Sequence, residues 1–257
     1  MTWKKFPYPD AAYDYPGSAL QENWRRLHCG DGEPLPTDEK VCNAWRRYHA
    51  GDFGNAVEIG LACGIAGYNA ANKAATIYAS YLETVEAQKC RLWLEVAQRC
   101  EEQQEKTPRD CNAWYLHAFA LGRYSQSISV VKALAQGLGS KIKNSLTRAI
   151  ELEPRHADAH VALGAYHAEV IDKVGALVGG LTYGANKNTS NDLFQKALKL
   201  NPASAITRME YANALVLMFG KSRMKDAERL YQEAAGLTAM DAMERLDVEA
   251  AKAELAE

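Results

Sequence analysis

The sequence predicts an all-α fold in which pairs of helices stack into an α-solenoid. From Thr37 onward Ala, Leu, Glu, Lys and Gln dominate, and the alternating β-branched pattern of strands is scarce. The sequence shows no alternation of strands with helices, so we do not expect a parallel sheet. Helix-breaking residues interrupt the region at intervals that suit helix ends. These interruptions stand at Gly51, Gly67, Pro108, Pro154, Pro202 and Gly220.

Two segments of the sequence repeat each other closely. Residues 146–154 and 194–202 share a bulky apolar residue, an Ala three positions later, a Leu after three more and a Pro two positions further on. Residues 131–138 and 174–181 share a second pattern, Val-x-Ala-Leu-x-x-Gly-Leu. A repeat of about 45 residues indicates stacked units, each of which buries the face of its neighbour.

These repeats resemble the tetratricopeptide repeat (TPR) family, whose unit is a pair of helices in about 34 residues. The resemblance implies about four to five irregular helix pairs, with extended inserts of about 12–14 residues at 131–141 and 174–187. It rests on the two repeated segments and on Gly51-Asp52-Phe53-Gly54-Asn55-Ala56, Ala113-Trp114-Tyr115, Ala157-x-Ala159-His160-x-x-Leu163-Gly164 and Tyr211-x-Asn213-Ala214-Leu215, followed by Ala227, Tyr231 and Ala234.

The C-terminal half is also loosely similar to the helical-repeat tail of the regulator-of-microtubule-dynamics proteins. The similarity consists of Leu163-Gly164, a long insert, and Phe194-Gln195-Lys196-Ala197. This similarity covers only one repeat, so we infer no microtubule partner from it.

The two ends of the chain differ from the repeats. Residues 1–36 hold five of the eight prolines with interleaved aromatic residues, which oppose helix and favour burial. We expect an extended arm that lies over the domain or a neighbouring subunit, with a short helix near 18–27. The helical-repeat domain then spans 37–257. Residues 238–257 form an amphipathic pattern that predicts a C-terminal capping helix.

Composition narrows the function classes. The 257 residues carry 30 basic and 32 acidic side chains, so no positive excess favours nucleic acid. The most apolar run, 56–71, contains Glu58 and is too short to span a membrane. The six cysteines form no CxxC motif, and the first residues lack the apolar core of a signal peptide. We therefore expect a cytoplasmic protein with reduced cysteines and no membrane span.

Motifs for catalysis or cofactor binding are weak. His156, His160 and His167 share one helix face, but a rise of about 10 Å separates the last two, so we expect no metal. Residues 137–141, Gly-Leu-Gly-Ser-Lys, lack the P-loop spacing, so we expect no nucleotide cofactor. No sequence signature of a catalytic nucleophile, acid or base appears, and we expect no enzyme activity.

The sequence predicts a scaffold that binds another protein or peptide on the concave face of the solenoid. The alternative is a carrier of a small apolar ligand in a pocket built by the Gly-rich inserts, unless these form buried turns. If the concave face binds no partner, its aromatic residues would instead pack against the N-terminal arm. Partner identity and homo-oligomerisation stay open. The predicted partner-binding residues are Trp45, Tyr48, Tyr115, Phe119, Arg123, Glu169, Asn213 and Phe219.

Overall fold

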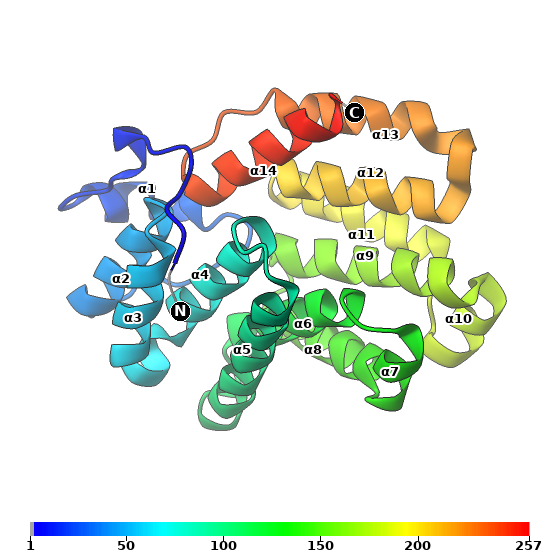
Figure 1. The fold of residues 1–257 in the computed structure, drawn as a ribbon, viewed down its shortest axis with the longest axis horizontal. Helices are drawn as coiled ribbons and strands as arrows, with labels where there is room; N and C mark the ends of the chain where they lie inside the picture. Colours follow the sequence, from blue (N-terminus) through cyan, green and yellow to red (C-terminus); the bar gives the residue numbers. More distant parts are fainter. Residues whose placement is uncertain (1–2, 257) are drawn as a thin grey trace.

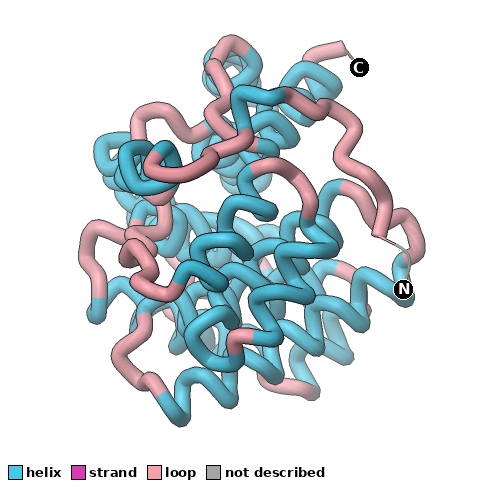
Figure 2. The backbone as a smooth tube through the Cα atoms, turned by 90° about the vertical axis from the view of Figure 1, so that its left-hand side faces the viewer, coloured by secondary structure: helices cyan, strands magenta, loops and turns pink. Residues whose placement is uncertain are grey.

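The computed structural model describes residues 3–256, and the secondary structure of this part is helical, joined by loops (Figure 2). Five pairs of neighbouring helices follow one another along the chain, as the sequence predicted. They are α2 (Glu39–His49) with α3 (Phe53–Ala62), α4 (Tyr68–Tyr81) with α5 (Glu86–Lys106), α6 (Cys111–Gln126) with α8 (Leu138–Leu152), α9 (Ala157–Val174) with α11 (Lys187–Leu200), and α12 (Ala205–Phe219) with α13 (Met224–Ala235).

The remaining elements lie outside these pairs (Figure 1). Two short helices interrupt the third and fourth pairs, and α14 follows the last pair. The elements outside the pairs are α1 (Ala19–Leu27), α7 (Val130–Ala135), α10 (Ala176–Tyr183), α14 (Ala242–Glu254) and the 3-10 turns η1 (Ala11–Tyr13), η2 (Gly64–Gly67) and η3 (Gly220–Arg223).

The two Pro-terminated segments occupy equivalent places in successive pairs. Ala149 and Ala197 are both fully buried, and each carbonyl accepts the amide hydrogen bond that closes its helix. Pro154 and Pro202 follow directly and prevent the helix from continuing. This confirms the repeat that the sequence predicted.

Small side chains are needed where paired helices touch. A Cβ atom at Gly164 on α9 would lie 2.9 Å from the Phe194 ring on α11, so only glycine fits. Ser190 also donates a hydrogen bond to the Gly164 carbonyl at 2.8 Å. The other side of Phe194 stacks on Tyr211 of the next pair, with ring centroids 4.9 Å apart. One aromatic ring therefore joins two successive pairs.

The N-terminal segment lies over its own domain and contributes to its core. Trp3 packs edge-on against Tyr78 of α4, with ring centroids 4.4 Å apart. The Tyr15 hydroxyl donates a hydrogen bond of 2.6 Å to the Met240 carbonyl near the other end of the chain. Phe6 packs so close to Gly51 that a Cβ there would lie 2.6 Å from its ring, and the φ of +83° at this turn also favours glycine.

Helix α14 packs against α13 and α12, as expected of a cap, but it also reaches the first helix pair (Figure 1). Asp241 at its N-terminus lies 2.8 Å from the buried His49 of α2. Glu244 forms a bidentate ion pair with Arg26 of α1. The helix therefore joins the two ends of the repeat array, a role beyond that of the predicted cap.

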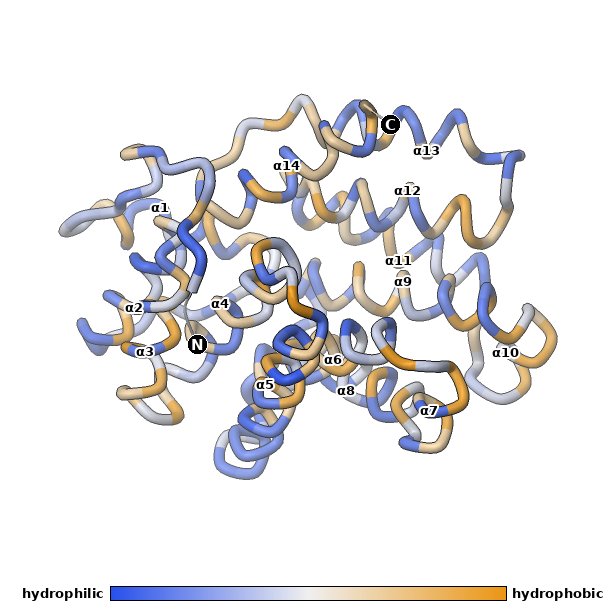
Figure 3. The backbone as a smooth tube through the Cα atoms, viewed as in Figure 1, coloured by the Kyte–Doolittle hydropathy of each residue, from blue (hydrophilic) through white to orange (hydrophobic). Residues whose placement is uncertain are grey.

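The two inserts form short helices on one edge of the molecule (Figure 3). Several of their apolar side chains lie largely in solvent: Val131 of α7 is 77 % exposed, and Leu177 and Leu181 of α10 are 76 % and 83 % exposed. These side chains therefore do not form buried turns. The backbone of the two insert helices is coloured largely orange at α7 and in part orange at α10 in Figure 3, which marks apolar residues.

Candidate functional site

The first helices of four successive pairs, α4, α6, α9 and α12, surround a pocket of about 220 Å³. The insert helix α7 and the start of α8 close one end of it, and α14 closes another. Because its walls come from several different helices, the pocket is formed by the fold itself rather than by a single loop. We call it the central pocket.

Four predicted partner-binding residues line the central pocket together. Tyr115, Phe119 and Arg123 follow one another on α6 at intervals of four residues, which places them on one face of the helix. The Tyr115 and Phe119 rings lie 6.1 Å apart, and the Arg123 guanidinium lies 5.4 Å from the Phe119 ring centre. Glu169 faces them from α9.

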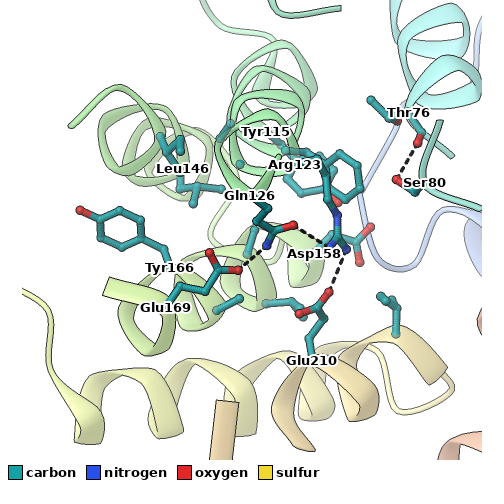
Figure 4. A pocket seen from close by; sticks show the side chains of 18 of the residues that line it. Thr76, Ser80, Tyr115, Arg123, Gln126, Leu146, Asp158, Tyr166, Glu169 and Glu210 are labelled. Carbon is teal, nitrogen blue, oxygen red and sulfur yellow. Dashed lines mark hydrogen bonds and ion pairs between the residues drawn. The ribbon is translucent and has the colours of Figure 1, made fainter. Parts of the chain in front are cut away.

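Arg123 connects α6 to α12 across the pocket (Figure 4). Its guanidinium donates a hydrogen bond of 2.9 Å to Glu210 and one of 3.3 Å to Gln126. Gln126 in turn donates to Glu169. Burial disfavours the charge of Arg123, but the Glu210 carboxylate more than compensates and raises the pKa of the guanidinium. Arg123 is therefore a fixed cation.

The other predicted residues lie elsewhere. Asn213 is exposed in a neighbouring depression that Arg123 and Glu169 also line, and it accepts a hydrogen bond of 2.6 Å from Tyr231. Phe219 lies at the end of α12, outside the central pocket, with the Lys187 ammonium 4.8 Å from its ring centre. Asn213 thus lies beside Arg123 and Glu169 in this neighbouring depression, whereas Phe219 lines neither it nor the central pocket.

Trp45 and Tyr48 of α2 lie in the core, because each is only 1 % exposed. The arm and α14 cover the inner face of α2: Trp24 of α1 packs edge-on against Trp45 at 5.8 Å, and Met243 of α14 lies 2.9 Å from the Tyr48 hydroxyl. We therefore correct their assignment to the concave surface and leave them out of the site.

A polar end of the central pocket was not predicted from the sequence. Lys73 of α4, Asp158 of α9 and Asp247 of α14 line it. The Lys73 ammonium is bound by the buried Asp31 and lies 4.0 Å from Asp158. A Cβ at Gly30 would lie 2.4 Å from Asp158, so glycine leaves the space that this carboxylate fills.

Burial controls the charges at this polar end. It raises the pKa of Asp158 to about 6, against the opposing effect of Lys73. Burial also raises the pKa of Asp247, although Tyr81 donates a hydrogen bond to it. Lys73 keeps its proton because Asp31 outweighs the cost of burial and raises its pKa. The end thus has one cation already engaged and two carboxyl groups that burial makes costly to ionise.

The opposite end of the central pocket is apolar and includes residues of both inserts. Here α7 and α8 face α9 and the last residue of α10, so the inserts build one wall, as the alternative from the sequence supposed. Its side chains are Val130, Ala133, Leu134, Leu138, Ile142, Leu146, Tyr166, Val170, Val174 and Tyr183.

The three histidines considered as metal ligands each have a separate partner. His156 caps α9 by accepting from the Ala159 amide at 3.1 Å, and its other nitrogen lies 3.0 Å from Asn112. His160 lies 3.0 Å from the Pro154 carbonyl, and His167 accepts a hydrogen bond from the Asn186 amide. Within residues 3–256, no three His, Cys, Asp or Glu side chains are grouped to hold a metal ion.

Two further findings concern the part of the chain that the structure describes. None of its helices has both the length and the apolar character needed to cross a bilayer. The six cysteines are free.

No protein-family model and no curated protein matches the sequence. Among solved structures, the chain is similar to a thermophilic TPR protein of Thermus thermophilus, with 15 % identity and a TM-score of 0.58. The match covers 84 % of this chain and 98 % of that chain. It does not bear on the resemblance to regulator-of-microtubule-dynamics proteins, which stays a prediction. At this identity the likeness shows the fold alone: the chain has a TPR-like helical-repeat fold.

Proposed function

We propose that this chain is a non-catalytic binding module that holds a peptide segment of another protein in the central pocket. The observation that carries the proposal is the convergence of Tyr115, Phe119, Arg123 and Glu169 on the inward side of the helix pairs. Aromatic and arginine side chains supply most of the binding energy in many protein interfaces.

The fold also favours binding through its rigidity. Arg123 and Gln126 are already held by Glu210 and Glu169, so little side-chain freedom is lost when a partner binds. Helical-repeat proteins of this architecture present long preformed surfaces and commonly mediate protein interactions. A peptide is the partner that best suits a pocket surrounded by four inward helices.

Gly122 offers a direct test of this proposal. It lines the central pocket, and a Cβ there would meet no atom within 4 Å. Gly122→Trp should therefore fill the pocket without disturbing the helix. The matched control is Gln98→Trp, at an exposed position on α5 outside the pocket.

The probe is a displayed library of random dodecapeptides selected against the full chain. We expect selected peptides to bind the wild type and Gln98→Trp equally in fluorescence polarisation, and to bind Gly122→Trp at least about tenfold more weakly. Circular dichroism should give the same helicity for all three proteins. Selected peptides that bind Gly122→Trp as well as the wild type would refute the role of the pocket.

A second function, carriage of a small apolar ligand, is favoured by the apolar end of the pocket. Leu134, Leu138 and Ile142 there form a wall of aliphatic carbon, and a volume of about 220 Å³ suits a small molecule. The neutral probe N-phenyl-1-naphthylamine should then fluoresce with the wild type and not with Gly122→Trp. Equal fluorescence with both would exclude this function.

A further inference from the structure

We propose that the polar end of the central pocket binds a cation, so that the partner segment presents a Lys or Arg side chain followed by apolar residues. This inference rests on the proposed function, because it names the chemistry of the peptide that the pocket takes. Three observations at the polar end support it: two carboxyl groups with spare acceptor oxygens, a pocket-lining hydroxyl that makes no hydrogen bond in the described part of the chain, and two internal cations that are already engaged.

The first observation concerns hydrogen-bond acceptors. Asp158 accepts no hydrogen bond from the described part of the chain, and its nearest cation, Lys73, stands 4.0 Å away. Asp247 is only 3 % exposed, yet just one of its oxygens accepts a hydrogen bond within residues 3–256, from Tyr81. Buried carboxyl oxygens normally have donors, so this end of the pocket has spare acceptors.

The second observation is the hydroxyl of Tyr115. This residue is only 8 % exposed and lines the pocket, but its hydroxyl makes no hydrogen bond within residues 3–256. Burial raises the pKa of Tyr115, and the Asp158 carboxylate raises it further. Figure 4 shows Tyr115, Arg123 and Asp158 at the same end of the pocket. The hydroxyl oxygen can accept a hydrogen bond from an ammonium or guanidinium group.

The third observation concerns the cations already present. Five carboxyl groups and three basic side chains line the pocket. Of the basic groups, Lys73 is bound by Asp31, which lies outside the pocket lining, and Arg123 is bound by Glu210. Lys73 lies 4.0 Å from Asp158 and lowers its pKa, but it donates its hydrogen bond to Asp31. An incoming cation would therefore find the Asp158 and Asp247 oxygens as acceptors, whereas a peptide carboxylate would bring an anion beside carboxyl groups that burial already makes costly to ionise.

The shape of the pocket extends this chemistry to a peptide. The methylene chain of a Lys or Arg side chain can pass along the Phe119 and Tyr115 rings, where a cation gains further attraction. Apolar neighbours in the same segment would then fill the end built by Leu134, Leu138 and Ile142. The pocket thus selects a basic residue beside apolar ones.

The test compares the wild type with Asp158→Asn, using peptides from the dodecapeptide selection. The control is Asp172→Asn, an exposed carboxyl on the same helix. We expect most pocket-dependent peptides to share a Lys or Arg. Replacing it with norleucine should weaken binding about tenfold to the wild type and to Asp172→Asn, but less than about twofold to Asp158→Asn.

The pH dependence provides a second readout. Burial raises the pKa of Asp158 to about 6, with Lys73 opposing this rise and Asp31 and Glu244 adding to it. The Asp158 carboxylate in turn raises the pKa of Tyr115. Binding of the basic peptide should therefore strengthen about tenfold between pH 5 and 7, as Asp158 loses its proton. The norleucine peptide and the Asp158→Asn variant should show no such rise.

The outcomes separate the two proposals. Peptides that Gly122→Trp excludes, but whose binding does not depend on a basic residue or on Asp158, would overturn this inference and leave the proposed function intact. If the selection yields no peptide that Gly122→Trp excludes, the proposed function fails, and the inference fails with it.

Discussion

Two aromatic pairs on inward helices have different surroundings. Trp45 and Tyr48 on α2 are each 1 % exposed, whereas Tyr115 and Phe119 on α6 line the central pocket. Both pairs lie on the first helix of a repeat. The difference comes from what covers them, because the N-terminal segment and α14 pack on α2 but leave part of α6 uncovered. Equivalent positions of the repeat are therefore buried in the core or open to the pocket, depending on which segments pack over them.

Replacing one member of each pair would show this difference as stability. Trp45→Ala should lower the free energy of unfolding by about 4 kcal/mol, because it empties a fully buried site. Phe119→Ala should cost about 1–2 kcal/mol, since its half-buried ring already faces the pocket. Urea denaturation followed by circular dichroism measures both values. Equal losses would mean that α2 and α6 are covered alike.

The sequence-based predictions succeeded where a feature depends on local contacts and failed where it depends on contacts between distant parts of the chain. Local patterns were sufficient for the repeats, because Ala149, Ala197 and the following prolines act through contacts within one or two helices. The group of Tyr115, Phe119 and Arg123 was also found, since four-residue spacing on one helix is a local property.

The rest depends on contacts between distant parts of the chain. Asp241 contacts His49 across 192 positions, so no local pattern shows that α14 covers α2. The polar end likewise joins Lys73, Asp158 and Asp247 from three helices. The inserts read as apolar, but whether they were buried depended on neighbours that the sequence does not identify.

Acid offers a second way to compare core and pocket, because two residues near the start of α9 respond in opposite directions. His156 lies in the core, where burial lowers its pKa to about 4, below the value of 6.5 in the unfolded chain. The folded state therefore binds fewer protons, and its stability is lost as pH falls from 6.5 towards 4. Asp158 faces the pocket and its pKa is raised to about 6, so protonation in acid removes the free-energy cost of burying its charge.

We expect His156 alone to cost about 2 kcal/mol of stability between pH 7 and 5. His156→Asn keeps a capping side chain for α9 and should lose less stability over this range than the wild type. Asp158→Asn should lose more stability than the wild type over this range, because it has no carboxyl group whose protonation stabilises the folded state. Urea denaturation at both pH values measures the three slopes, and a steeper slope for His156→Asn than for the wild type would contradict the burial of that imidazole.

The insert helices are the least covered part of the molecule, and a substitution of an exposed residue there should have the smallest effect on stability. Leu181 of α10 is 83 % exposed, so Leu181→Ser removes little buried surface and should change stability by less than about 0.5 kcal/mol. Leu138 lies at the start of α8 and is only 4 % exposed, so Leu138→Ser should cost about 3 kcal/mol. Thermal unfolding of the two variants side by side measures the contrast. A large loss for Leu181→Ser would mean that α10 is covered in solution, which would place this edge with α2 rather than with the open face of α6.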